Sequence, residues 1–186
     1  ELFDNSNIQG ASAVSAMVKY IDGKAVPKEY RKYKIKTVNG QDDYHSMMEV
    51  IERRYKRLLF EKEKLPSLII VDGGKTQIKA ALIVLEKLGL INEINVIGLL
   101  LDDRHRTRAI MNSKFEEILI DKKSDLFLLL ESMQDEVHRF AITFFKKTHT
   151  KNTLTSVLDN IEGLGKNRKR TLLENFESIE DIKHTS

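Results

Sequence analysis

The sequence predicts an α/β fold in which a mixed sheet is flanked by helices. Strand-like segments open the chain, apolar residues then recur at helical spacing, and short apolar runs alternate with further helical stretches. The 186 residues, 41% of them hydrophobic and 32% charged, suffice for one large domain, or for one domain and a small module.

The first segments are expected to form an antiparallel meander. Strand-like stretches cover residues 1–8, 14–22 and 28–37, and Tyr30, Tyr33 and Ile35 supply side chains that favour strands. Asp22 and Gly23 fit a tight turn between the second and third stretches.

Helices and buried strands are expected to alternate in the middle of the chain. Residues 42–61 carry apolar side chains at three- and four-residue spacing, which predicts a helix. The apolar runs 68–71 and 94–100 suit buried strands, and a helix between them ends at Gly89. Three antiparallel strands, a helix, a parallel strand, a helix and a further strand is the order of a ribonuclease H-like fold.

The last third is expected to hold a hairpin, a long helix and a small helical module. The hairpin covers residues 101–121, the helix 126–147, and the polar stretch 148–153 is predicted to be a linker. Two short helical segments then flank residues 162–165. We therefore expect one domain over residues 1–150 and a small all-α segment over residues 151–186.

Composition restricts the kinds of site. Without cysteine, the chain has no disulfide and no thiolate ligand, so a bound metal must be held by carboxylates, imidazoles and water, which favours Mg²⁺ or Mn²⁺. No run approaches the ~20 apolar residues that span a bilayer, and the first residues do not resemble a signal peptide. We expect a cytoplasmic protein with no membrane partner.

Basic residues concentrate in two segments. Residues 19–36 hold seven Lys and Arg against two acidic residues, and a second cluster, Lys166, Arg168, Lys169 and Arg170, lies near the C-terminus. Charge patterning alone leaves two interpretations open for each cluster, a solvated surface or a contact with nucleic acid.

Two aspartates, Asp4 and Asp72, each end an apolar run. If both runs are strands of one sheet, the two carboxylates meet at a sheet edge and can hold a divalent cation. An N-cap of the following helix is the alternative role for Asp72. The stretch Asp72-Gly73-Gly74-Lys75 lacks the spacing of a nucleotide-binding P-loop, which argues against ATP binding.

Six short motifs follow one another along nearly the whole chain. They are Phe3-Asp4-Asn5-Ser6, Asp42-Asp43-Tyr44, Arg53-Arg54-Tyr55, Asp72-Gly73-Gly74-Lys75, Asp103-Arg104-His105-Arg106-Thr107 and Asp135-Glu136-Val137-His138-Arg139-Phe140-Ala141. Together they resemble the C-terminal half of the UvrC family, the nuclease subunits of bacterial nucleotide excision repair. Nothing here resembles the N-terminal nuclease or the UvrB-binding segment of that family.

The resemblance implies a ribonuclease H-like, metal-dependent endonuclease domain that makes the 5′ incision in the damaged strand. Its partners would be damaged double-stranded DNA and the UvrB–DNA complex. The alternative is a catalytically inactive DNA-binding or partner-docking module on the same scaffold.

The resemblance also implies site residues. Asp4, Asp72 and His138 would bind Mg²⁺ or Mn²⁺ and form an Asp-Asp-His active site, with Asp43 as a supporting catalytic residue. Without the resemblance, His138 would be a partly buried polar residue, and Asp43 an acidic residue that the helix dipole favours.

Several basic residues are candidates for contacts with DNA phosphates. Lys75, Arg53, Arg54 and Arg139 belong to the motifs, although a salt bridge is the alternative role for each arginine. Residues 158–176 are similar to a helix-hairpin-helix, whose glycines let the backbone approach a phosphate. Gly163, Gly165, Lys166 and Arg168 would make those contacts, and the two basic residues would add salt-sensitive affinity.

Overall fold

The protein is described here from a computed structural model, which covers residues 1–6, 14–38, 42–102, 106–161, 164–176 and 182. The chain divides into two compact units, residues 1–141 and 142–186. In the part of the chain that the structure describes, no helix is both long and apolar enough to cross a membrane.

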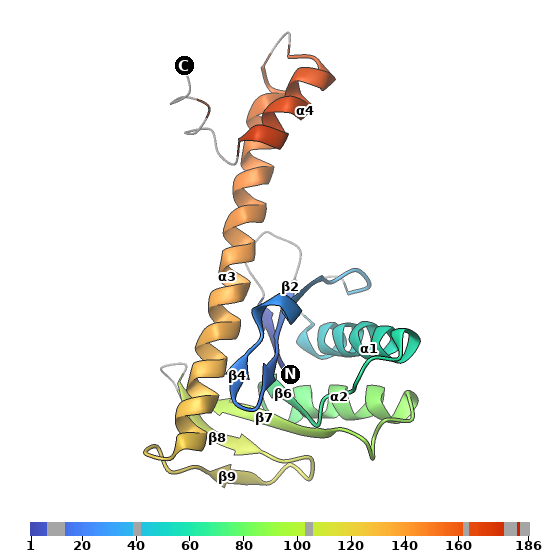
Figure 1. The fold of residues 1–186 in the computed structure, drawn as a ribbon, viewed down its shortest axis with the longest axis vertical. Coiled ribbons are helices and arrows are strands. Elements are labelled where there is room, and N and C mark those ends of the chain that lie inside the picture. The colour runs from blue at the N-terminus through green and yellow to red at the C-terminus, as the bar shows by residue number, and fades with distance from the viewer. Residues whose placement is uncertain (7–13, 39–41, 103–105, 162–163, 177–181, 183–186) are drawn as a thin grey trace. The chain divides into compact units, whose positions relative to one another are not determined.

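A seven-stranded mixed sheet forms the centre of the first unit (Figure 1). Its strands are β1 (Leu2–Ser6), β2 (Val14–Val18), β5 (Arg31–Lys34), β6 (Leu68–Asp72), β7 (Asn95–Leu101), β8 (Thr107–Met111) and β9 (Glu117–Leu119). They lie in the order β5-β2-β1-β6-β7-β8-β9. The three central strands β1, β6 and β7 are parallel, and the remaining pairs are antiparallel. The predicted ribonuclease H-like mixed sheet is confirmed.

Helices cover both faces of this sheet. They are α1 (Asp43–Glu61), α2 (Lys75–Lys87) and the first part of α3 (Asp125–Asp159). The helices α1 and α2 bury their apolar faces with Phe3 and Val71 in one core cluster. The first part of α3 packs Leu130, Met133 and Val137 against the opposite face, in a second cluster. Because successive side chains of a strand point to opposite faces, Phe3 points toward α1 and α2, and Asp4 points toward α3.

The predicted turn at Asp22 and Gly23 is present, and both residues have the positive φ of a tight hairpin. The hairpin is a separate two-stranded sheet formed by β3 (Tyr20–Ile21) and β4 (Lys24–Ala25). A short 3-10 helix, η1 (Pro27–Glu29), then leads into β5. The second and third long strands still pair, but they are shorter than predicted because this small hairpin interrupts them.

The predicted linker at residues 148–153 is wrong, because α3 continues through it to Asp159. The segment contains neither Gly nor Pro, and polar residues alone do not end a helix. A further helix, α4 (Lys166–Asn175), follows in the second unit. The boundary at residue 150 stays a prediction.

Candidate metal centre

The register of two central strands places Asp4 beside Asp72. In the parallel pair of β1 and β6, Phe3 lies opposite Val71, so the next residue of each strand is an aspartate at the same end of the sheet. Asp4 is buried, and the side chain of Asp72 is 10% exposed. The carboxyl ends of parallel strands are the usual position of ligand sites in such sheets.

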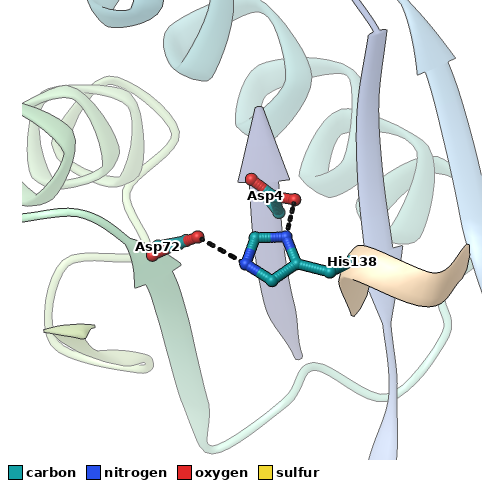
Figure 2. A group of neighbouring side chains, drawn as sticks. All are labelled: Asp4, Asp72 and His138. Atoms are coloured by element: carbon teal, nitrogen blue, oxygen red, sulfur yellow. Dashed lines mark hydrogen bonds and ion pairs between the residues drawn. The ribbon is translucent and has the colours of Figure 1, made fainter. Parts of the chain in front are cut away.

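His138 reaches these two carboxylates from α3. Its Nδ1 atom lies 2.9 Å from Oδ2 of Asp4, and its Nε2 atom lies 3.6 Å from Oδ2 of Asp72. Figure 2 shows the imidazole between the two aspartates, each of which comes from a different strand. One ligand atom from each residue lies within 4.8 Å of the others. Three segments that are far apart in sequence thus form one cluster.

The charges of this cluster suit a cation. Hydrogen bonding to the Asp4 carboxylate raises the pKa of His138, against partial burial, which lowers it. Two carboxylates and one imidazole form a donor set for a hard divalent ion that tolerates one nitrogen ligand, and both Mg²⁺ and Mn²⁺ meet that description. The donors present therefore fit the predicted metal.

The backbone after Asp72 is held by two glycines. Gly73 has φ +137°, a conformation that other residues rarely adopt, and its N–H donates to the carbonyl oxygen of Leu99 at 3.1 Å. A Cβ atom at Gly98 in β7 would overlap the carbonyl oxygen of Gly73. Sequence reasoning missed Gly98, although a glycine inside an apolar strand often marks such a close approach.

Asn5 links the first strand to α1. Its Nδ2 donates to the backbone carbonyl of Asp43 at 3.2 Å, so the start of α1 is tied to the residue after Asp4. The Asp43 side chain is exposed and is not a member of the Asp4, Asp72 and His138 group. No role was predicted for Asn5, although its position directly after Asp4 was a signal for one.

Residues 1–142 match the family described as the UvrC RNase H endonuclease domain. The chain belongs to this family. Membership makes it an endonuclease domain of nucleotide excision repair, and the predicted resemblance is confirmed. The matched residues include Asp4, Asp72 and His138 and end one residue beyond the first compact unit.

Two arginines predicted to bind DNA make contacts inside this UvrC domain. Arg54 is 4% exposed, and its guanidinium donates to both carboxylate oxygens of Glu1 at 2.5 and 3.3 Å. Because this charge is buried and paired, we leave Arg54 out of the DNA-binding set. Arg53 is partly exposed and donates to Glu49 at 2.8 Å and to the carbonyl oxygen of Lys34 at 2.7 Å.

The other two candidates of the UvrC domain lie at its surface. Lys75 is exposed at the start of α2, with its Nζ 5.2 Å from the ring centroid of Phe115. Arg139 follows His138 on α3 and is 65% exposed, although it donates two hydrogen bonds of 2.7 Å to Glu136. Burial excludes neither residue from a phosphate contact.

The remaining candidates belong to the second unit, outside the matched UvrC domain. Gly165 is the N-cap of α4, and Lys166 and Arg168 are exposed in the first turn of that helix. Gly163 lies outside the described residues. The DNA contacts of this segment, and its helix-hairpin-helix character, stay predictions.

Proposed function

We propose that this chain is a divalent-metal-dependent DNA endonuclease that makes the 5′ incision in the damaged strand during bacterial nucleotide excision repair. Its membership of the UvrC endonuclease family supports the reaction class. The observation that carries the proposal is the gathering of Asp4, Asp72 and His138 where the parallel pairing of β1 and β6 ends, with ligand atoms within 4.8 Å of one another.

Asp4, Asp72 and His138 would hold the metal, Mg²⁺ or Mn²⁺. When bound there, such an ion stabilises negative charge on a phosphate and makes a water molecule nucleophilic near neutral pH. Asp4 and Asp72 are fixed by the hydrogen-bonded strands that carry them, so their carboxylates need little rearrangement to bind a cation.

His138 is suited to binding a metal or to moving a proton. Its side chain is 39% exposed, so a substrate phosphate and water can reach the ring, while the helix backbone limits its position. A neutral imidazole can accept a proton near pH 7. Asp43, at the start of α1, is proposed as a supporting carboxylate near this site.

The DNA strand is proposed to lie across the carboxyl ends of the central strands. Lys75 and Arg139 are exposed near Asp72 and His138 in sequence and supply positive charge for the phosphates. Arg53 is a further candidate, and Gly163, Gly165, Lys166 and Arg168 of the second unit would bind the backbone elsewhere. The proposed partner is damaged duplex DNA presented by the UvrB–DNA complex.

The test is a nicking assay on a lesion-containing duplex labelled at one end, with Mn²⁺ or Mg²⁺ and the other repair proteins supplied. Asp72→Asn should reduce the 5′ incision at least about 10³-fold, because it removes a charged metal ligand. The matched control is Asp22→Asn, which neutralises an exposed aspartate in the β3–β4 turn. Unchanged incision by Asp72→Asn would contradict the proposal, and DNA binding without incision would favour the inactive-module alternative.

A further inference from the structure

The basic segment of residues 19–36 does not form a single surface. Lys19 forms an ion pair with Glu29, and Arg31 donates to the backbone carbonyls of Lys28 and Tyr30 at 3.1 and 2.9 Å. These two cations therefore have contacts within the fold. Sequence alone could not show these contacts.

Lys24 and Lys28 are far from the metal centre along the sheet. Strand β2 runs antiparallel to β1 and ends at Val18, opposite Leu2, so the chain leaves the sheet at the amino end of β1, two residues before Asp4. The β3–β4 hairpin that carries Lys24 follows directly, and Lys28 lies in η1 before the chain re-enters the sheet. Both are exposed.

Lys32 lies in the same row of the sheet as Asp4. Asp4 is opposite Ala16 in β2, and Ala16 is opposite Lys32 in β5. Side chains in one row point to the same face, and neighbouring strands lie about 4.8 Å apart, which puts the Lys32 backbone about 10 Å from that of Asp4. Lys34, two residues further along β5, is on the same face.

Contacts with α3 confirm this orientation for Lys32. Its Nζ lies 4.2 Å from the ring centroid of Phe140. Phe140 follows two residues after His138, the residue that contacts Asp4. Tyr30 packs edge-on against the same ring at 5.1 Å between centroids. A cation–π contact favours the charged ammonium and limits its motion. One helix therefore holds both the metal-centre histidine and the Lys32 charge in place.

We propose that Lys32, together with Lys34, binds phosphodiester groups of the substrate strand next to the metal centre and fixes where that strand crosses it. This inference rests on the proposed function. Strand β5 is at one edge of the sheet, so DNA that lies across the carboxylates can pass over it. At a rise of about 3.4 Å per nucleotide, the separation of about 10 Å corresponds to about three nucleotides from the cut.

The first test compares Lys32→Gln and Lys34→Gln with the matched control Lys24→Gln in the full chain. Each removes one positive charge. Binding to a fluorescein-labelled duplex is measured by anisotropy from about 50 to about 200 mM salt. Lys32→Gln should weaken binding about 3- to 10-fold and reduce the salt slope by about 0.9, whereas Lys24→Gln should change neither. Lys32→Arg should restore the slope, and melting curves show whether each variant is folded.

The second test locates the contact on the DNA. Phosphates on each side of the incision position are replaced one at a time by uncharged methylphosphonates, and wild type and Lys32→Gln are compared on each duplex. The affinity ratio of the two proteins should fall to about one only where the contacted phosphate is neutral. A ratio that is the same at every position would overturn the inference.

The outcomes separate this inference from the proposed function. If wild type nicks DNA in a metal-dependent way while folded Lys32→Gln keeps its affinity and salt slope, only the Lys32 contact is overturned. If the chain binds DNA through Lys32 and never incises it, only the endonuclease proposal is overturned. A wild-type chain that does not bind the duplex at about 50 mM salt would also overturn the Lys32 contact.

Discussion

The residue before β1 and the middle residue of β1 belong to two clusters of charged side chains that are built differently. At the start of the chain, the buried Glu1 carboxylate accepts hydrogen bonds from the Arg54 guanidinium and from the Tyr55 hydroxyl at 2.9 Å. In the middle of the strand, Asp4 meets a second carboxylate, Asp72, and a single imidazole, that of His138. The first cluster matches one carboxylate with one permanent cation. The second gathers two carboxylates around one imidazole, and the hydrogen bond to Asp4 raises the pKa of that imidazole.

This difference is the one expected between a structural cluster and the proposed metal centre. A buried carboxylate paired with an arginine and a hydroxyl has its charge and its hydrogen-bonding capacity satisfied, so it gains little from a further ligand. Two carboxylates held together repel each other, which opposes folding and favours the binding of a cation. Removing a charge should therefore cost much more stability in the first cluster than in the second.

The largest effect is expected for Asp4→Asn, which should reduce incision at least about 10³-fold, or about 4 kcal/mol in activation free energy. The free energy of unfolding of the metal-free chain should change by less than about 1 kcal/mol, because relief of the repulsion from Asp72 offsets the loss of the charged hydrogen bond to His138. Nicking rates and urea denaturation measure the two quantities. If Asp4→Asn were strongly destabilised and still incised DNA normally, the Asp4 cluster would be structural and not the metal centre.

Arg54→Ala should lower the free energy of unfolding by about 3–5 kcal/mol, because it leaves the Glu1 carboxylate buried without its cation. The matched control is Arg57→Ala, which removes an exposed i,i+4 pair with Glu61 and should cost less than about 1 kcal/mol. Urea denaturation of both variants measures the difference. Equal losses would show that the Glu1 cluster does not stabilise the core.

Glu49 extends the comparison to acid stability. Burial raises its pKa, but hydrogen bonds from Thr37, from the Lys36 backbone and from Arg53 outweigh this and lower the pKa to about 2. The ionised Glu49 therefore contributes fully to the free energy of unfolding above the ordinary pKa of 4.5. This contribution is lost as the pH falls from 4.5 toward 2. Glu49→Gln should cost about 1–3 kcal/mol at pH 7 and much less at low pH. A pH-independent cost, measured by urea denaturation across this range, would contradict the assignment.

The smallest effect concerns metal binding without DNA. Mn²⁺ at ten times its dissociation constant should raise the free energy of unfolding of wild type by about 1.4 kcal/mol. Asp72→Asn should lose this increase, whereas the Arg57→Ala control should keep it. Calorimetric melting with and without Mn²⁺ measures the increase, and an equal increase in Asp72→Asn would place the metal elsewhere.

The sequence predicted the two metal-centre aspartates because each follows an apolar run, and strand pairing brings such residues together. His138 required the family resemblance, since one histidine on a helix has no distinctive pattern. Arg54 was assigned to DNA because its motif resembles a functional one, and its burial depends on Glu1, 53 positions earlier in the chain. The position of Lys32 relative to Asp4 depends on the register of an intervening strand, which local sequence does not specify.

Gly98 shows how a residue outside the Asp4, Asp72 and His138 group can limit the evolution of the proposed metal centre. The turn that follows Asp72 passes so close to β7 that a single methyl group at position 98 would collide with it. A relative with a larger residue there must route the chain after its second aspartate differently. The residue at this one position should therefore distinguish, among related sequences, those that can place the aspartate in the same way from those that cannot.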